Sequence, residues 1–326
     1  MRDGLLLGID GGASKTAGVM MDCQGTPLAQ ARLGGSAIVG KPSAESCRVL
    51  ASVVDSLCAQ VGTIRNAVSW CGVGLNGVDF ADELPIQHEH ISRAIGIPAE
   101  RVALVNDGII ALWGATPARK AVIIQHGSGF TAAYRSAYGR EALFDHLSVA
   151  RAFDMRSGLI AAAARMINGQ VAPTPLKAKA LAFFGIADDG YYCEAVYRDQ
   201  IPRELRLGTV PLIYESWLQG DSVAADLVER AVEDYGSAAS AMIAKTGSRS
   251  PDVIFGGGLL ACAPLEFREL LTKRIRRSYP DITAKPPDLA PEFGAAIMAG
   301  YRIGLDADAL FRGALCHSAE GPRADL

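Results

Sequence analysis

Residues 5–16 read LLLGIDGGASKT, a short apolar run that ends in an aspartate and two glycines. The run Leu5–Ile9 has the length and composition of a buried strand, and the glycine pair predicts a tight turn after it. Further strands are predicted over residues 16–22 and 28–33. Three strands in succession form a β-meander, which differs from the strand–helix unit of a dinucleotide-binding fold.

The turn at residues 10–16 carries the groups that an anion-binding site needs. The pair Gly11-Gly12 lets backbone N–H groups approach a phosphate closely, and Ser14 and Thr16 add hydroxyl donors. Asp10 ends the strand and is suited to hold hydrated Mg²⁺, because this ion favours one or two carboxylates together with phosphate oxygens. The spacing matches neither the Walker A nor the G-x-G-x-x-G motif. A plain hairpin with polar turn residues is the alternative for this stretch alone.

Two later strand candidates also end in glycine turns, Gly127-Ser128-Gly129 and Gly256-Gly257-Gly258. The triple glycine opens a predicted helix, whose N-terminus favours anionic or polar ligands. Aligning Gly12 with Gly127 places a strand and a second glycine turn after each, which predicts a duplicated architecture. Ordinary loops, and coincidence in a chain with 35 glycines, are the alternatives.

Asp107 follows Asn106 at the end of a strand candidate over residues 102–105. A carboxylate in such a place can orient an alcohol and accept its proton during phosphoryl transfer. An aspartate is equally suited to cap the helix that starts at Gly108. The sequence by itself leaves both roles open.

Composition favours a globular two-domain chain without nucleic-acid or membrane partners. The 326 residues are too many for one ordinary core and fit two domains. Hydrophobic residues make up 49% and charged residues 21%, and a net charge of −3 gives no strong field toward either partner. The seven cysteines are odd in number and never spaced C-x-x-C, so a reducing cytoplasm is the expected compartment.

Helical periodicity dominates the remaining chain, which together with the strands indicates a mixed α/β class. The domain boundary is predicted near residues 114–120. Helices are predicted over residues 43–61, 157–167, 202–218, 222–245, 264–277 and 292–305.

The order Asp-Gly-Gly, Asn-Asp, Gly-Ser-Gly and Gly-Gly-Gly, spread over Leu5 to Ile303, resembles the BadF/BadG/BcrA/BcrD-type ATPase family. That family includes the N-acetylglucosamine kinases and belongs to the actin/hexokinase/heat-shock-chaperone superfamily. The resemblance implies an α/β, ribonuclease H-like (actin-like ATPase) fold in two lobes with a nucleotide cleft between them. Residues 1–115 would form the first lobe and residues 116–291 the second, with a C-terminal helix, residues 292–326, returning to the first.

The resemblance also implies a reaction and a set of site residues. It implies ATP and Mg²⁺ as cofactors and a sugar as substrate, most simply an amino sugar such as N-acetylglucosamine or glucosamine. Asp107 would be the catalytic base, and Asp10 would hold the metal. The nucleotide is expected at Asp10, Gly11, Gly12, Ser14, Lys15, Thr16, Gly127, Ser128, Gly256, Gly257 and Gly258. The substrate is expected at Ser36, Asn76, Gly77, Asn106, Asp107 and Asp154.

Three segments depart from the family pattern. The second phosphate motif, normally Gly-Thr-Gly-Ser, reads Gln125-His126-Gly127-Ser128, and the bulkier His126 would either crowd the phosphates or donate to them. The interdomain Gly-Asp-Glu-Gly-Ser signature reads Phe-Asp-Met-Arg-Ser over residues 153–157. Ser36-Ala37 stands where members that bind N-acetyl sugars often carry an asparagine. These changes weaken the assignment of a specific sugar.

Two other functions are weighed against the kinase. An ATPase that activates a 2-hydroxyacyl-CoA dehydratase would need cysteines for an iron–sulfur cluster, and no cysteine lies between Cys71 and Cys193. A non-catalytic sugar- or nucleotide-binding regulator usually carries a helix-turn-helix before the first strand, where only four residues stand. The kinase is preferred, and a homodimer is left open.

Overall fold

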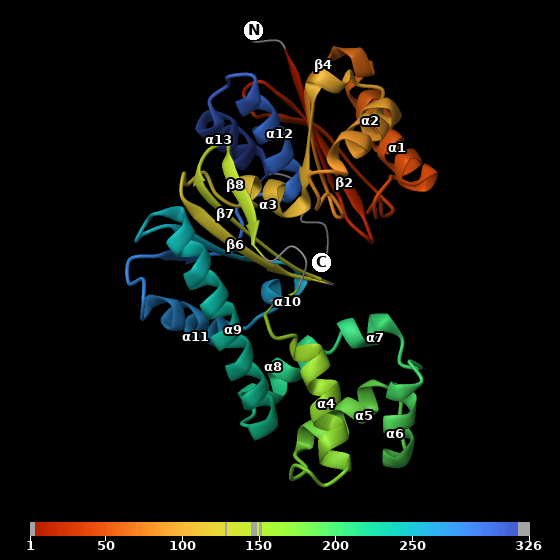
Figure 1. Cartoon of the computed structure of the whole chain (residues 1–326), viewed down its shortest axis with the longest axis vertical. Helices are drawn as coiled ribbons and strands as arrows, with labels where there is room; N and C mark the ends of the chain where they lie inside the picture. Colours follow the sequence, from red (N-terminus) through yellow and green to blue (C-terminus); the bar gives the residue numbers. More distant parts are fainter. Residues whose placement is uncertain (1–3, 128, 145–148, 150–151, 319–326) are drawn as a thin grey trace.

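The computed structural model describes residues 4–127, 129–144, 149 and 152–318, which form two lobes, each built on a five-stranded sheet (Figure 1). In the first sheet the strand order is β3-β2-β1-β4-β5. Strands β1, β2 and β3 pair antiparallel, and β4 and β5 continue the sheet in parallel. The strands are β1 (Leu5–Gly11), β2 (Thr16–Asp22), β3 (Pro27–Leu33), β4 (Val68–Leu75) and β5 (Val102–Asn106).

The second sheet repeats this connectivity. Its order is β10-β9-β6-β7-β8, with an antiparallel meander from β6 to β8 and with β9 and β10 added in parallel. The duplicated architecture predicted from the glycine turns is thereby confirmed in topology. The strands are β6 (Ala121–His126), β7 (Phe130–Ala137), β8 (Arg140–Phe144), β9 (Asp252–Gly256) and β10 (Thr283–Lys285).

Helices cover both faces of the first sheet. The side chains of Leu7, Ile9 and Val73 point to one face, where they pack with α1 and α2. Leu6 and Val19 point to the other face, where they pack with helices from later in the chain. Alternating burial along β1 and β2 produces these two cores. The helices are α1 (Ala44–Val61), α2 (Leu84–Ile95), α3 (Asp107–Ala115), α12 (Pro291–Arg302) and α13 (Ala307–Ser318), with short 3₁₀ turns at Arg65–Ala67 and Ala99–Arg101.

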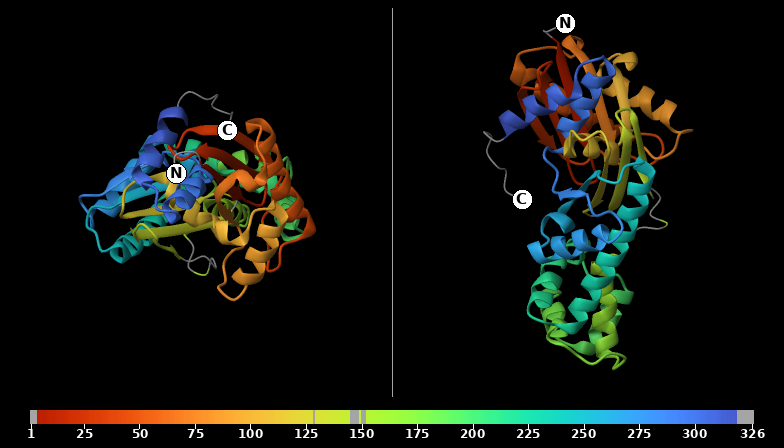
Figure 2. Two further views of the ribbon diagram at one scale, coloured as in Figure 1. Left: turned by 90° about the horizontal axis from the view of Figure 1, so that it is seen from above. Right: turned by 90° about the vertical axis from the view of Figure 1, so that its left-hand side faces the viewer.

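The second sheet lies between α3 on one face and α9 and α11 on the other. Helices α4 to α8, residues 155–218, extend from this lobe to the end of the molecule farthest from the first lobe (Figure 2). Among the described residues, no helix combines the length and the apolar character needed to cross a membrane. The helices are α4 (Met155–Ile167), α5 (Pro175–Phe183), α6 (Asp189–Tyr197), α7 (Arg203–Leu207), α8 (Val210–Leu218), α9 (Ser222–Thr246), α10 (Gly258–Ala261) and α11 (Leu265–Arg276).

Two predicted helices are each broken in the structure. The helix predicted over residues 202–218 is interrupted at Gly208-Thr209. Pro211 stands in the first turn of α8 and cannot donate a backbone N–H to a preceding turn. The C-terminal helix predicted over residues 292–326 is divided into α12 and α13 by Gly304, whose φ of 86° ends a right-handed helix. Residues beyond 318 lie outside the described part of the chain.

The two segments that cross between the lobes are bonded to each other. The N–H groups of Asp288 and Leu289 donate to the carbonyl oxygens of Ala115 and Gly114, at 3.1 and 3.0 Å. Arg135, which is fully buried, donates from its guanidinium to the carbonyls at positions 116 and 118. The same guanidinium lies over the rings of Trp113 and Tyr138, 5.4 and 4.8 Å from their centroids. A buried cation therefore fixes the backbone where the chain leaves the first lobe.

Helix α12 lies so close to the first sheet that their backbones are in contact. A Cβ atom on Gly8 would overlap the carbonyl oxygen of Glu292, and one on Gly72 would overlap that of Ala295. Gly294 of the helix itself faces α3, where a Cβ would overlap the carbonyl oxygen of Ile110. Glycine is needed at these three contacts because no side chain fits between the elements. Helix α12 is thus packed directly on the first sheet.

Replacing Gly294 by alanine is expected to separate α12 from α3. Overpacking of this kind typically costs about 1–3 kcal/mol, against about 1 kcal/mol gained in helix propensity. The free energy of unfolding, measured with urea, should therefore fall. Gly190→Ala in α6 is the matched control, because its added Cβ makes only ordinary contacts. Equal stability of the two variants would contradict the proposed backbone contact.

Candidate active site

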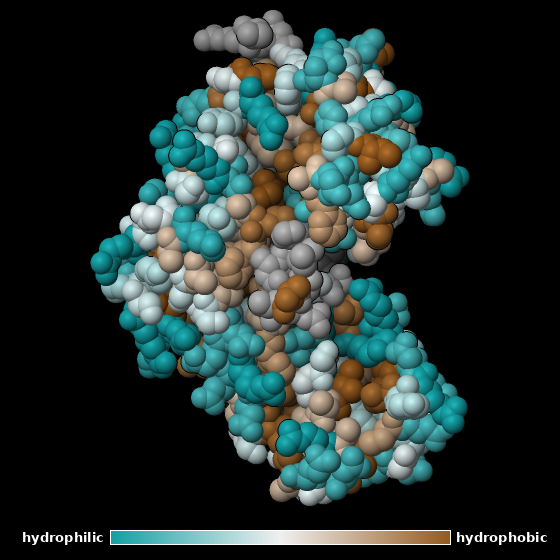
Figure 3. Space-filling view, viewed as in Figure 1, coloured by the Kyte–Doolittle hydropathy of each residue, from teal (hydrophilic) through white to brown (hydrophobic). Residues whose placement is uncertain are grey.

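A cavity of about 670 Å³ lies between the lobes, where the carboxyl ends of β1, β5, β6 and β9 meet. On the surface, a notch on the right of Figure 3 separates the first lobe from the helices α4 to α8 at the far end of the molecule. The cavity is lined by Asp10, Gly12, Ala13, Ser14, Lys15, Asn76, Asp107, Gln125, Gly127, Gly129, Thr131, Arg156, Leu207, Gly208, Val210, Pro211, Gly257, Gly258, Leu259, Cys262 and Pro291. The structure therefore brings Asp10, Asp107 and all three glycine turns to one cleft.

Asp10 is the penultimate residue of β1 and is 9% exposed. Burial, with the nearby carboxylates of Glu292 and Asp107, raises the pKa of Asp10 to about 7, while Lys15 opposes the rise. Glu292, in the first turn of α12, is half-buried, and its partial removal from water raises its pKa. Sequence reasoning missed Glu292, because only the return of α12 to the first sheet places it here.

The residues around Asp10 fit a hydrated Mg²⁺ ion bound together with a nucleotide. The carboxylates of Asp10 and Glu292, with Lys15 as the cation that acts on both, leave negative charge that a divalent cation would neutralise. The turn ahead of β2 is closed by a bond of 2.9 Å from the N–H of Gly12 to the carbonyl of Lys15. Among the described residues, no three His, Cys, Asp or Glu side chains are grouped as a metal centre.

Asp107 is the first residue of α3, and the helix is capped by its neighbour Asn106. The side-chain oxygen of Asn106 accepts from the N–H of Gly108 at 2.8 Å, while its amide donates to Asp79 at 2.9 Å. Burial raises the pKa of Asp107, and hydrogen bonds from Gly108 and Asn76 oppose the rise. Since Asn106 serves as the cap, Asp107 is left as a carboxylate in the cleft wall, where a raised pKa makes a better proton acceptor.

Several predicted site residues do not line the cleft but bond to the segments that form it. The hydroxyl of Thr16 donates to the Gly34 carbonyl at 2.7 Å and lies 2.8 Å from the Ser36 hydroxyl, which ties the first glycine turn to the loop after β3. Asp154 caps α4 and pairs with Arg156 at 2.7 Å. Predicted residues absent from the lining are Gly11, Thr16, Ser36, Gly77, Asn106, Asp154 and Gly256. Ser128 lies outside the described residues.

His126, the residue that departs from the family pattern, points into the second lobe and is 2% exposed. Its Nδ1 lies 2.5 Å from the Tyr235 hydroxyl, and its Nε2 lies 3.0 Å from a terminal nitrogen of Arg156. A guanidinium only donates, so Nε2 accepts and the ring is neutral with its proton on Nδ1. His126 was expected to crowd the phosphates or donate to them. The structure instead buries its ring beside the second glycine turn, where it bonds to Tyr235 and Arg156.

The α10 turn touches the second glycine turn directly. Gly257 has φ of 79°, and a Cβ there would lie 2.7 Å from backbone atoms of His126. The junction of α7 and α8 also lines the cavity, through Leu207, Gly208, Val210 and Pro211. Sequence reasoning missed this junction, because a continuous helix was predicted across it. Gly208 followed closely by Pro211 was the available signal.

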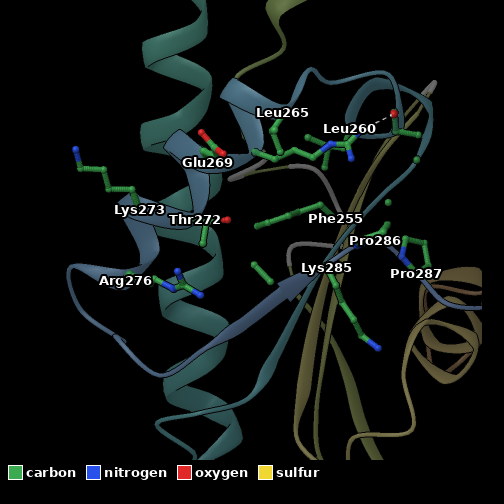
Figure 4. Close-up of a pocket in the computed structure, with 15 residues that line it drawn as sticks. Phe255, Leu260, Leu265, Glu269, Thr272, Lys273, Arg276, Lys285, Pro286 and Pro287 are labelled. Atoms are coloured by element: carbon green, nitrogen blue, oxygen red, sulfur yellow. Dashed lines mark hydrogen bonds between the residues drawn. The ribbon is translucent and has the colours of Figure 1, made fainter.

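A second groove, of about 660 Å³, lies on the other side of α10 (Figure 4). Phe255, Leu265 and Thr272 converge on it from β9 and α11, and Pro286 and Pro287 stand across from them. Gly257 belongs to both walls, but neither Asp10 nor Asp107 reaches this groove. Of the two cavities, only the first therefore contains these two carboxylates.

Two lobes with matching sheets, joined around one cleft, define the actin-like ATPase class with its ribonuclease H-like fold. Residues 7–299 match the BadF/BadG/BcrA/BcrD ATPase family. The chain belongs to that family, and both the predicted fold and the predicted family are confirmed.

Sugar kinases are among the proteins that resemble the chain. An N-acetylmuramic acid/N-acetylglucosamine kinase of Clostridium acetobutylicum is 23% identical over 301 residues, 90% of this chain and 97% of that protein. A crystal structure assigned as an N-acetylglucosamine kinase of Chromobacterium violaceum gives a TM-score of 0.68 at 23% identity, over 92% of this chain and all of that one. A ROK family glucokinase of Streptomyces griseus, solved with glucose and AMPPNP, gives 0.52 at 22% identity, over 92% of this chain and all of that one.

Replacing Asp10 by asparagine is expected to stabilise the nucleotide-free protein at high pH. The pKa of about 7 lies above the unfolded value, so the folded state holds the proton more tightly and its stability falls as pH rises from about 4 to about 7. The variant escapes this loss, which is at most about 4 kcal/mol. Urea unfolding at pH 4.5 and pH 8 measures it.

The stability difference between this variant and the wild type should be small at the lower pH and largest at pH 8. Glu100→Gln, at an exposed acid outside the cleft, serves as the control and should change stability little at either pH. A difference that is the same at both pH values would contradict the raised pKa of Asp10.

Proposed function

We propose that the chain is an ATP-dependent kinase that phosphorylates a hydroxyl of an amino sugar, with N-acetylglucosamine and glucosamine as the first candidates. The observation that carries the proposal is the convergence of Asp10, Asp107 and the three glycine turns on one cleft. Family membership supports the use of ATP, and the sugar kinases among the relatives support the acceptor. Mg²⁺ as the metal and the cytoplasm as the compartment are part of the proposal.

Each residue of the cleft has a defined task in this reaction. Asp107 accepts the proton of the sugar hydroxyl as its oxygen forms a bond to the γ-phosphorus, while the bond from that phosphorus to the bridging oxygen of ADP breaks. The turn of residues 12–15 places backbone N–H groups and Lys15 beside the phosphates. Mg²⁺, when bound with the nucleotide, neutralises charge on the phosphate oxygens. Asp10 is the carboxylate that would hold it.

The acceptor end of the cleft is next to Asp107. Asn76, at the end of β4, bonds to Asp107, and both line the cavity. Thr131 of β7 also lines it and lies against Gly108, where a Cβ would be 2.5 Å from the threonine methyl. We assign Asn76 and Thr131 to sugar hydroxyl contacts, since both present hydrogen-bonding groups beside the base.

The substrate is tested by measuring ADP release across hexoses, hexosamines and N-acetylated sugars. The proposal expects turnover to be greatest with a 2-amino or 2-acetamido sugar. Faster turnover with plain hexoses would overturn the amino-sugar assignment. Sugar binding without ADP release from any member would instead indicate a regulator.

Asp107→Asn is expected to lower kcat by about 10²–10⁴-fold, because asparagine keeps the shape of the side chain but cannot accept the proton. Both KM values should change little. The matched control is Asp188→Asn, which makes the same substitution at the cap of α6, outside the cleft. A folded variant at position 107 with more than about a tenth of the wild-type kcat would exclude a role as base.

A further inference from the structure

Two departures from the family pattern contact each other in this chain. Arg156 stands where the interdomain signature has glycine, and His126 stands where the second phosphate motif has threonine. The guanidinium of Arg156 donates to Nε2 of His126 at 3.0 Å and to the carbonyl of Gly127 at 2.6 Å. Sequence reasoning treated the two changes separately, yet the fold makes them one unit.

The guanidinium of Arg156 is fixed by hydrogen bonds to three neighbouring residues. It stands in the first turn of α4, is 6% exposed, and lines the cleft. Its Nε–H donates to Asp154 at 2.7 Å, so the ion pair uses Nε and not the two terminal nitrogens of the guanidinium. His126, itself bonded to Tyr235, is the neutral acceptor for one terminal nitrogen. A buried cation with this many fixed partners keeps one orientation, which pre-organises it for a ligand.

The guanidinium has donors left for a ligand. Of its five N–H groups, Asp154, Gly127 and His126 use three within the described residues, and one remains on each terminal nitrogen. Those nitrogens belong to a residue of the cleft wall. Planar pairs of N–H groups suit phosphate oxygens, which accept from two donors at once.

The position of this cation points to the nucleotide rather than the sugar. Arg156 is bonded to Gly127, in the turn that follows β6. The other cation of the described cleft lining is Lys15, which comes from the corresponding turn of the first lobe. Because the two sheets share one topology, the two turns occupy equivalent places in their lobes. A chain of phosphates between them would meet one cation from each lobe.

We propose that Arg156 contacts the terminal phosphates of ATP and that His126 is the residue that positions it. The inference rests on the proposed function for the identity of the nucleotide. In this chain the arginine supplies an anion-binding contact from α4. Arg156 also holds the carbonyl of Gly127, so the shape of the turn and the charge beside it depend on the same side chain.

Calorimetry with adenosine, AMP, ADP and AMPPNP in the presence of Mg²⁺ tests the phosphate contact. Arg156→Gln should leave adenosine affinity unchanged and weaken AMPPNP by about 10- to 100-fold, the usual effect of a charge-assisted hydrogen bond. Arg156→Lys should fall between, since lysine keeps the charge but not the fork. The control is Arg165→Gln, at an exposed arginine on the same helix. Equal losses for adenosine and AMPPNP, or no loss for either, would overturn the proposal.

A double-mutant cycle tests the positioning role of His126. If His126 acts through Arg156, His126→Thr weakens AMPPNP binding in the wild type but has little further effect once Arg156→Gln is present. His126→Gln keeps an oxygen acceptor for the guanidinium and should restore most of the affinity. Additive effects of the two substitutions would show that the residues act independently and would reject the pair.

These measurements need neither a sugar nor turnover. A wild-type protein that binds AMPPNP but phosphorylates no sugar would defeat the proposed kinase while leaving the Arg156 test intact. Conversely, an active kinase whose AMPPNP affinity is unaffected by Arg156→Gln would defeat only the present inference. Thermal unfolding of each variant, compared with the Arg165 control, shows whether a loss of affinity reflects loss of the fold.

Discussion

The contact on which the cleft depends is the one between helix α12 and the first sheet. Because Gly8 and Gly72 carry no side chains, the helix lies directly on β1 and β4, and Gly294 lets α3 approach it from the side. This packing brings Glu292 to the end of β1, where its carboxylate helps to raise the pKa of Asp10. The electrostatics of the candidate metal position are therefore set by a backbone packing contact.

The second constraint is the fixed crossing between the lobes. Both crossing segments are bonded to each other, and Arg135 is bonded to one of them from within the second lobe. Breaking these bonds would leave a buried cation without partners, which is costly. The carboxylates of the first lobe and the turns of the second consequently line the same cleft.

Most of the framework was predictable because it rests on local patterns. The strand–glycine turns at Asp10, Gly127 and Gly256 are visible as apolar runs with abrupt ends, and the structure confirms strands at all three. The position of Glu292 could not be predicted because it requires a tertiary contact, the packing of α12 on the first sheet. Two other failures are local. Asp154 was expected in the cleft, but its carboxylate is used by Arg156, a partner that spacing alone does not specify. Likewise, the break before α8 depends on Gly208 together with the following proline.

The packing of α12 on the first sheet has a consequence for biosynthesis, because the helix comes much later in the chain than the strands it covers. Strands β1 and β4 leave the ribosome early, whereas the helix that covers their inner face belongs to the last part of the described chain. At about 5–20 residues per second, that apolar face waits on the order of tens of seconds for its partner. The second lobe is synthesised completely in the interval and is free to fold first. The lobe that is made first is thus finished last, and its nascent sheet is a surface that a chaperone is suited to cover.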